Sequence, residues 1–132
     1  MSKRLLILVE DEWVTSRALV LDLTEAGYFV ETAEDDREVV RKARSRSYDL
    51  LIAADPRGGE SAGRVIDRFR EERPEAKVVL MTTEGGSRSG PVDSGDESDR
   101  VTRIRKPFDL DTIRTVVDGL LESGRATSGN AT

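Results

Sequence analysis

The chain has 132 residues, which is enough for one domain and too few for two. It contains no cysteine and no histidine, which excludes disulfides, most zinc and iron chemistry, and histidine-based acid–base steps on this chain. The net charge of −5, with acids and arginines interleaved, argues against autonomous DNA binding, because a DNA-binding face must neutralise phosphates. No apolar run reaches the length of a signal peptide or a membrane span, so we expect a soluble, cytoplasmic protein.

The first third of the chain predicts a strand, a helix, a second strand and a second helix. Residues 4–9 form a short continuous apolar run, which is typical of a strand covered on both faces in a parallel sheet. Residues 14–26 are amphipathic, and Gly27 is suited to end this helix. Residues 28–33 predict the second strand, and Asp36 is placed to cap the second helix.

The remaining elements continue the same alternation. Residues 50–54 predict the third strand, and Ser61 is placed to cap an amphipathic helix. Residues 77–82 predict the fourth strand, and residues 101–105 a weaker fifth. Apolar residues recur at helical spacing over residues 113–121, which predicts the last helix.

One stretch interrupts the alternation of strands and helices. Residues 84–100 contain Val92 as their only large apolar residue, so they offer no apolar face with which a helix could dock. We expect a mobile loop there, with the fourth helix of the alternation missing or disordered. Residues 124–132 are rich in small and polar residues and predict a disordered tail after a single domain over residues 1–123. The fold class is therefore α/β, with a doubly wound five-stranded parallel sheet whose functional crevice lies at the carboxyl ends of the strands.

Four segments at the predicted strand ends carry chemically distinctive residues. They are LILVEDE with Glu10 and Asp11, YDLLIAA at residues 48–54, KVVLMTT with Thr82, and RKPFDLDTI with Lys106 and Pro107. In this order and spacing they resemble the receiver domains of response regulators in two-component signalling. The resemblance extends over residues 4–121 and implies the flavodoxin-like topology of that family.

The resemblance also implies a set of roles. In the family, a strand-end aspartate takes a phosphoryl group from a kinase phosphohistidine, and an acid pair helps to hold Mg²⁺. Glu10 and Asp11 match the acid pair, and Thr82 matches the switch threonine. Lys106, followed by Pro107, matches the lysine that pairs with a phosphoryl oxygen.

The acceptor position departs from the family pattern. The acceptor lies five residues after the aspartate of the YDL triplet, and from Asp49 this count reaches Ala54. A methyl group cannot be phosphorylated. Asp55 lies one residue further, at the start of a predicted loop. A shift of one residue along a strand turns a side chain to the opposite face, unless a bulge or the freedom of the strand end brings it back.

Two further departures point the same way. The switch aromatic of the family lies three residues before the lysine, where this chain has Arg103. The fourth helix, a part of the family's output face, is not predicted in residues 84–100. In the family, the acceptor, the switch aromatic and the fourth helix take part in one two-state conformational change. Their joint loss therefore indicates that this chain has lost switching.

The residues that remain at the strand ends have two interpretations. Glu10 and Asp11 could bind Mg²⁺, weakly because one carboxylate is missing, or Lys106 could neutralise them in a charge-balanced cluster that needs no metal. We favour the charge-balanced cluster. Thr82 and Pro107 could equally serve the architecture of the strand ends.

The first helix carries apolar residues away from its expected core side, namely Trp13, Val14, Val20 and Leu21. They form either a broad, well-covered helix or an exposed patch for a partner. In the family, the first helix and its adjoining loop form the kinase-docking surface.

These observations predict a stand-alone, degenerate receiver, or pseudo-receiver, which is not an enzyme and requires no cofactor. It would bind a histidine kinase, another response regulator or a downstream protein without phosphorylation, and would contact neither nucleic acid nor membrane. The first alternative is a conventional Mg²⁺-dependent response regulator that uses Asp55 as its acceptor. The second is a small flavodoxin-like enzyme or cofactor binder, against which the low aromatic content and the lack of a phosphate-binding glycine motif argue.

Overall fold

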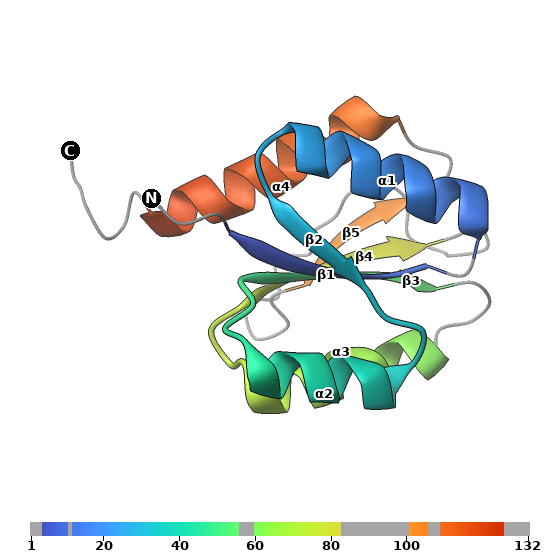
Figure 1. The fold of residues 1–132 in the computed structure, drawn as a ribbon, viewed down its shortest axis with the longest axis vertical. Coiled ribbons are helices and arrows are strands. Elements are labelled where there is room, and N and C mark those ends of the chain that lie inside the picture. Colours follow the sequence, from blue (N-terminus) through green and yellow to red (C-terminus); the bar gives the residue numbers. More distant parts are fainter. Residues whose placement is uncertain (1–3, 11, 56–59, 83–100, 106–108, 126–132) are drawn as a thin grey trace.

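A computed structural model of the chain describes residues 4–10, 12–55, 60–82, 101–105 and 109–125. These residues form a single five-stranded sheet with helices on both faces (Figure 1). Within these ranges, no helix is both long enough and apolar enough to cross a bilayer.

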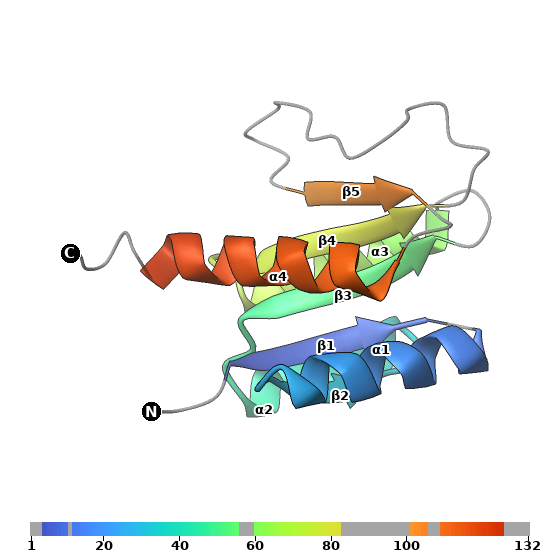
Figure 2. The same ribbon diagram turned by 90° about the horizontal axis from the view of Figure 1, so that it is seen from above.

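All strand pairs in the sheet are parallel, as the sequence predicts. The strands are β1 (Leu5–Val9), β2 (Phe29–Thr32), β3 (Leu50–Asp55), β4 (Lys77–Thr82) and β5 (Val101–Arg105). Their order across the sheet is β2-β1-β3-β4-β5, which confirms the doubly wound topology (Figure 2). Because all strands run in the same direction, their carboxyl ends meet at one edge, where the crevice was predicted.

Four helices cover the sheet in the described part of the chain. They are α1 (Trp13–Glu25), α2 (Asp36–Ser45), α3 (Glu60–Glu72) and α4 (Leu110–Arg125). Helices α1 and α4 lie on one face, and α2 and α3 lie on the other (Figure 1). Helix α4 matches the predicted last helix and continues to Arg125, two residues into the segment predicted as a tail. Residues 83–100 and 126–132 lie outside the described residues, so the predicted loop and the end of the tail stay predictions.

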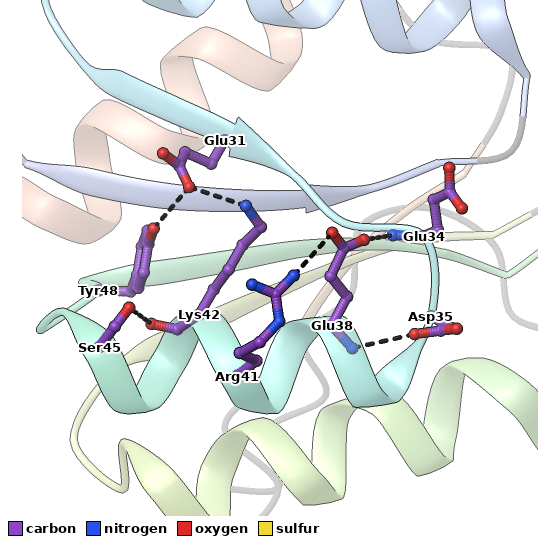
Figure 3. Close-up of polar contacts among 8 residues, drawn as sticks. All are labelled: Glu31, Glu34, Asp35, Glu38, Arg41, Lys42, Ser45 and Tyr48. Carbon is purple, nitrogen blue, oxygen red and sulfur yellow. Dashed lines mark hydrogen bonds and ion pairs between the residues drawn. The ribbon is translucent and has the colours of Figure 1, made fainter.

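The predicted helix ends are partly confirmed. Gly27, just beyond α1, has φ 105°, a left-handed conformation that favours glycine. Two predicted caps were wrong. The N-cap of α2 is Asp35 rather than Asp36, and its carboxylate accepts a hydrogen bond from the backbone N–H of Glu38 at 3.0 Å (Figure 3). Ser61 lies inside the first turn of α3, which begins one residue earlier.

The interior consists of two apolar clusters, one on each face of the sheet. Alternate residues of each strand supply the two faces, because successive side chains of a strand point in opposite directions. The cluster under α1 and α4 includes Leu6, Leu8, Leu19, Leu23, Leu50, Ile52, Ala54, Met81, Ile113 and Val117. The cluster under α2 and α3 includes Ile7, Val39, Ala43, Leu51, Ala53, Val65, Ile66, Phe69 and Val78. The apolar runs predicted as strands are therefore covered on both sides.

Asp49 anchors the amino-terminal ends of three strands. Its Oδ2 accepts a hydrogen bond from the backbone N–H of Leu5 at 2.9 Å, and Arg4 Nη1 lies 3.6 Å from its Oδ1. Its own backbone N–H donates to the carbonyl of Leu5, and its carbonyl accepts from the N–H of Lys77. The aspartate of the YDL triplet thus holds β1, β3 and β4 in register at the edge opposite the predicted crevice.

Polar contacts also join the two helices on the first face. Arg114 of α4 donates to Asp22 of α1 at 3.3 Å and to Asp111 at 2.7 Å. Tyr28, which precedes β2, donates its hydroxyl hydrogen bond to Asp118 of α4. These contacts fix α4 against α1 and β2 in one arrangement.

Candidate functional site

The candidate site lies at the carboxyl edge of the sheet, on the side to which the strand arrows point in Figure 2. Glu10 directly follows β1, Ala54 and Asp55 end β3, and Thr82 ends β4. The register places the Cα of Ala54 beside that of Met81, and the Cα of Asp55 beside that of Thr82. The residues predicted from strand ends are thus brought to neighbouring strands of one edge.

Ala54 belongs to the interior rather than to an open pocket. It is 8% exposed and packs in the cluster beneath α1 and α4, together with Leu8 and Met81. Helix α1, which follows Glu10 along the chain, lies on the same face of the sheet (Figure 1). An apolar methyl group therefore occupies the position that counting from Asp49 assigns to the acceptor.

Asp55 is the last residue of β3, so the prediction that it begins a loop was wrong by one residue. The strand extends to it because its Cα pairs with that of Thr82 across the parallel ladder. Thr82 is half-buried and in turn pairs with Arg105 of β5. Residues 56–59 lie outside the described residues.

Glu10 takes part in the turn that starts α1. Its Oε2 accepts a hydrogen bond from the backbone N–H of Glu12 at 2.9 Å, and Glu12 is the N-cap residue of α1. Glu12 Oε1 in turn accepts from the hydroxyl of Thr15 at 2.6 Å. One carboxylate oxygen of Glu10 therefore has a structural role at the entrance of the helix.

Within the described residues, which exclude Asp11, the ligands of a Mg²⁺ site are incomplete, so weak Mg²⁺ binding by Glu10 and Asp11 stays a prediction. Mg²⁺ requires several oxygen ligands in near-octahedral geometry, whereas Ala54 offers none and Glu10 already uses one oxygen in the turn. No group of three metal-ligating side chains comes together within the described ranges. Asp11, Lys106 and Pro107 lie outside those ranges, so their charge-balanced cluster stays a prediction.

No family model matches the chain, but its sequence is similar to those of several regulatory proteins. The transcriptional regulatory protein TcrA of Mycobacterium tuberculosis is 31% identical over 110 residues, which are 82% of this chain and 42% of the relative. The transcriptional activator protein IrlR of Burkholderia pseudomallei is 31% identical over 124 residues, or 92% of this chain and 52% of the relative. The response regulator ArlR of Staphylococcus aureus is 28% identical over 118 residues, 88% of this chain and 52% of the relative. The chain thus spans about half the length of the curated relatives it matches.

Solved structures establish the fold. The receiver domain of the hybrid histidine kinase CckA matches 89% of this chain and 98% of its own, with a TM-score of 0.70 and 24% identity. A CheY-like receiver domain protein from Methanospirillum hungatei matches 97% of this chain and 100% of its own, with a TM-score of 0.73 and 17% identity. The chain has the receiver fold of two-component response regulators. This assignment agrees with the resemblance at the strand ends and with the strand order.

Arg103, which the resemblance aligns with the switch aromatic, lies in the middle of β5. Its Cα pairs with that of Leu80, and its side chain is half-buried. Its role in switching stays a prediction.

The outer side of α1 carries three exposed large apolar side chains. Trp13 is 69% exposed, Val14 is 66% exposed and Leu21 is 56% exposed. The guanidinium of Arg17 lies over the ring of Trp13, at 5.6 Å from its centroid. The prediction that Val20 shares this surface was wrong, because Val20 is half-buried and packs against the core cluster beneath α1.

A polar network on the other face of the sheet was not predicted from the sequence. Tyr48 is 3% exposed, and its hydroxyl donates to Glu31 Oε1 at 3.0 Å (Figure 3). Lys42 Nζ donates to the same oxygen, also at 3.0 Å. The hydrogen bond from Lys42 lowers the pKa of Glu31, although burial opposes this shift. Burial, followed by the hydrogen bond to Glu31, raises the pKa of Tyr48 to about 12.

The raised pKa of Tyr48 predicts a loss of stability at alkaline pH. The ordinary pKa of 10.0 applies to the unfolded chain, so the stabilisation from this hydroxyl is fully present below pH 10 and is lost as pH rises toward about 12. We expect the free energy of unfolding to fall more steeply across this interval in the native chain than in Tyr48→Phe. Urea unfolding followed by far-UV circular dichroism measures this difference. Equal slopes in the two proteins would contradict the assigned role of the hydroxyl.

Proposed function

We propose that this receiver acts as a pseudo-receiver, that is, as a protein-interaction domain of a two-component pathway that does not depend on its own phosphorylation. The observation that carries the proposal is the methyl group of Ala54, buried at the tip of the central strand. Phosphoryl transfer to a receiver needs a nucleophilic oxygen at this point, and an alanine side chain has none.

The surroundings of Ala54 support the same interpretation. Leu8 and Met81 belong to the same apolar cluster, so the Ala54 methyl group is packed as part of the interior. A side chain one residue further along an extended strand is expected on the opposite face. On this argument, Asp55 is a poor substitute for an acceptor, although its pairing with Thr82 keeps it at the same edge.

Asp49 and Glu10, two residues that match the family pattern, have structural roles in this chain. Asp49 joins the starts of three strands, and Glu10 supports the turn into α1. Both residues can therefore be retained for the fold alone. The resemblance to active receivers does not by itself argue for retained phosphoryl transfer.

The proposed activity is binding through a fixed surface. The contacts between α1, α4 and β2 favour a single arrangement, and the exposed apolar side of α1 offers the contact area. The partner would be a histidine kinase, another response regulator or a downstream protein. We assign protein binding rather than DNA binding to this domain, because its net charge is −5. The likeness to receivers favours signalling over a small enzyme or cofactor binder.

A phosphorylation assay tests the proposal. The chain is incubated with Mg²⁺ and a small-molecule phosphoryl donor, such as acetyl phosphate, and its intact mass is measured. We expect no gain of a phosphoryl group, because the acceptor oxygen is missing. Ala54→Asp is the matched comparison, and it is expected to gain one phosphoryl group, since it restores a carboxylate at the counted position.

The control for the conventional alternative is Asp55→Asn. If the native chain gains one phosphoryl group and Asp55→Asn does not, Asp55 is an acceptor and the pseudo-receiver proposal is wrong. The same experiment with a beryllofluoride mimic, followed by amide chemical shifts around β3, gives a second measurement that does not depend on the lifetime of an acyl phosphate.

A further inference from the structure

All three large apolar side chains that are exposed in the described part of the chain lie on α1. Trp13, Val14 and Leu21 are each more than half exposed. Leu19 and Leu23 of the same helix are fully buried, so the three exposed side chains lie on the side of α1 away from the core. No described helix or strand lies over the outer side of α1 (Figures 1 and 2). Scattered exposed apolar residues need no explanation, but a group confined to one helix side indicates a contact surface.

Two opposite charges lie at equal distances from Leu21 along α1. Arg17 lies four residues before Leu21, and Glu25 lies four residues after it. Both are exposed, and residues four apart fall on the same side of a helix. Arg17 already lies against the stripe, through its contact with the ring of Trp13.

The negative charge of Glu25 at the carboxyl end of α1 is electrostatically unfavourable within its own helix. Glu25 is the last residue of α1, where the helix dipole carries its negative end. The last turn contains no basic residue, and the residue one turn earlier is Leu21. A cation supplied from outside the helix would therefore stabilise this end.

We propose that the partner of this surface is a second copy of the chain, packed with its α1 antiparallel to the first. A two-fold axis at Leu21 brings the two Leu21 side chains together. It also places Arg17 of each copy opposite Glu25 of the partner subunit, because the two residues are equally far from Leu21 on either side. Trp13 and Val14 lie eight and seven residues before Leu21, so they reach past the end of the partner subunit's α1 and flank the contact. The contact is isologous and closed, so it yields a dimer and not a filament.

This inference deepens the proposed function, because it rests on the fixed α1 surface and names its occupant. One helix face is a small interface, so we expect a dissociation constant at or above about 10 micromolar. Analytical ultracentrifugation across that concentration range measures it. Leu21→Asp is expected to give a monomer at all concentrations, because it buries two carboxylates on the axis. The matched control is Arg37→Glu, which changes an exposed charge on α2 and is expected to leave association unchanged.

Charge reversal gives the decisive test of the antiparallel geometry. Arg17→Glu and Glu25→Arg are each expected to weaken self-association roughly tenfold or more, since each creates two like-charge contacts across the axis. A mixture of the two variants is expected to form heterodimers, because each symmetric contact then joins an acid to a base. Far-UV circular dichroism confirms that every variant is folded.

Two results would overturn the inference. One is a native chain that stays monomeric up to about millimolar concentration. The other is a pair of charge-reversed variants that do not associate on mixing. Neither result affects the phosphorylation assay, which concerns Ala54 and Asp55. A monomer that takes up no phosphoryl group would leave the pseudo-receiver proposal in place and assign α1 to a different protein.

Discussion

Phe69→Ala is expected to lower the free energy of unfolding by about 3–5 kcal/mol, the largest effect of any single substitution considered for this domain. Phe69 is the largest fully buried side chain in the described part of the chain. It projects from α3 into the cluster that also contains Ile7, Leu51 and Val78 from three strands. Because interiors are close-packed, its removal leaves a cavity between the helix and the sheet that these neighbours cannot fill.

Urea unfolding monitored by far-UV circular dichroism tests this expectation. Phe69→Leu is the matched control and is expected to cost less than half as much, because it retains most of the apolar volume. A domain of this size has a total stability of about 5–15 kcal/mol, so the alanine variant should be close to its unfolding threshold at 37 °C. A loss below about 1 kcal/mol would mean that α3 does not pack as described.

Asp49→Ala is expected to lower the free energy of unfolding by about 2 kcal/mol, the second largest effect. The substitution removes the acceptor of the Leu5 backbone N–H at 2.9 Å and the carboxylate beside Arg4. The N–H at the start of β1 then loses its partner, and the cost of an unpaired backbone donor exceeds the value of the lost bond. The ion pair contributes little, since both of its side chains are about one-third exposed.

The matched control separates these two contributions. Asp49→Asn keeps a side-chain oxygen that can accept the hydrogen bond from Leu5 but removes the charge. It is expected to cost less than half as much as Asp49→Ala, and the remaining cost should fall with added salt. If the two variants were equally destabilised, the charge rather than the hydrogen bond would hold the strands.

The sequence predicted the order of strands and helices because each strand has a contiguous apolar run. Residues 50–54 are buried on both faces, and no competing pattern of similar strength exists in that stretch. Helix ends were less predictable. Asp35 and Asp36 are chemically equivalent as caps, and only the backbone conformation selects Asp35, whose φ of −152° is extended.

The candidate site was predictable only in part. Counting along β3 located Ala54, and its burial agrees with an interior strand position. The assignment of Val20 to the surface failed because it lies at the margin of the helix, where residue spacing does not distinguish core from solvent. The network of Tyr48, Lys42 and Glu31 was missed because its members lie in the segment before β3, in α2 and in β2, and meet only once α2 packs on the sheet.

The position of Asp49 has a consequence for how such domains can change. Asp49 directly precedes β3 and Ala54 is the second-last residue of that strand, about 16 Å away at the usual rise per residue. The contacts of Asp49 that align the strands are therefore separate from the carboxyl end of β3, where chemistry would take place. A domain with this separation can lose phosphoryl transfer through a single substitution at the tip of β3 and still fold. The same separation allows a new chemical group to be introduced at the tip without a change to the contacts at the strand starts.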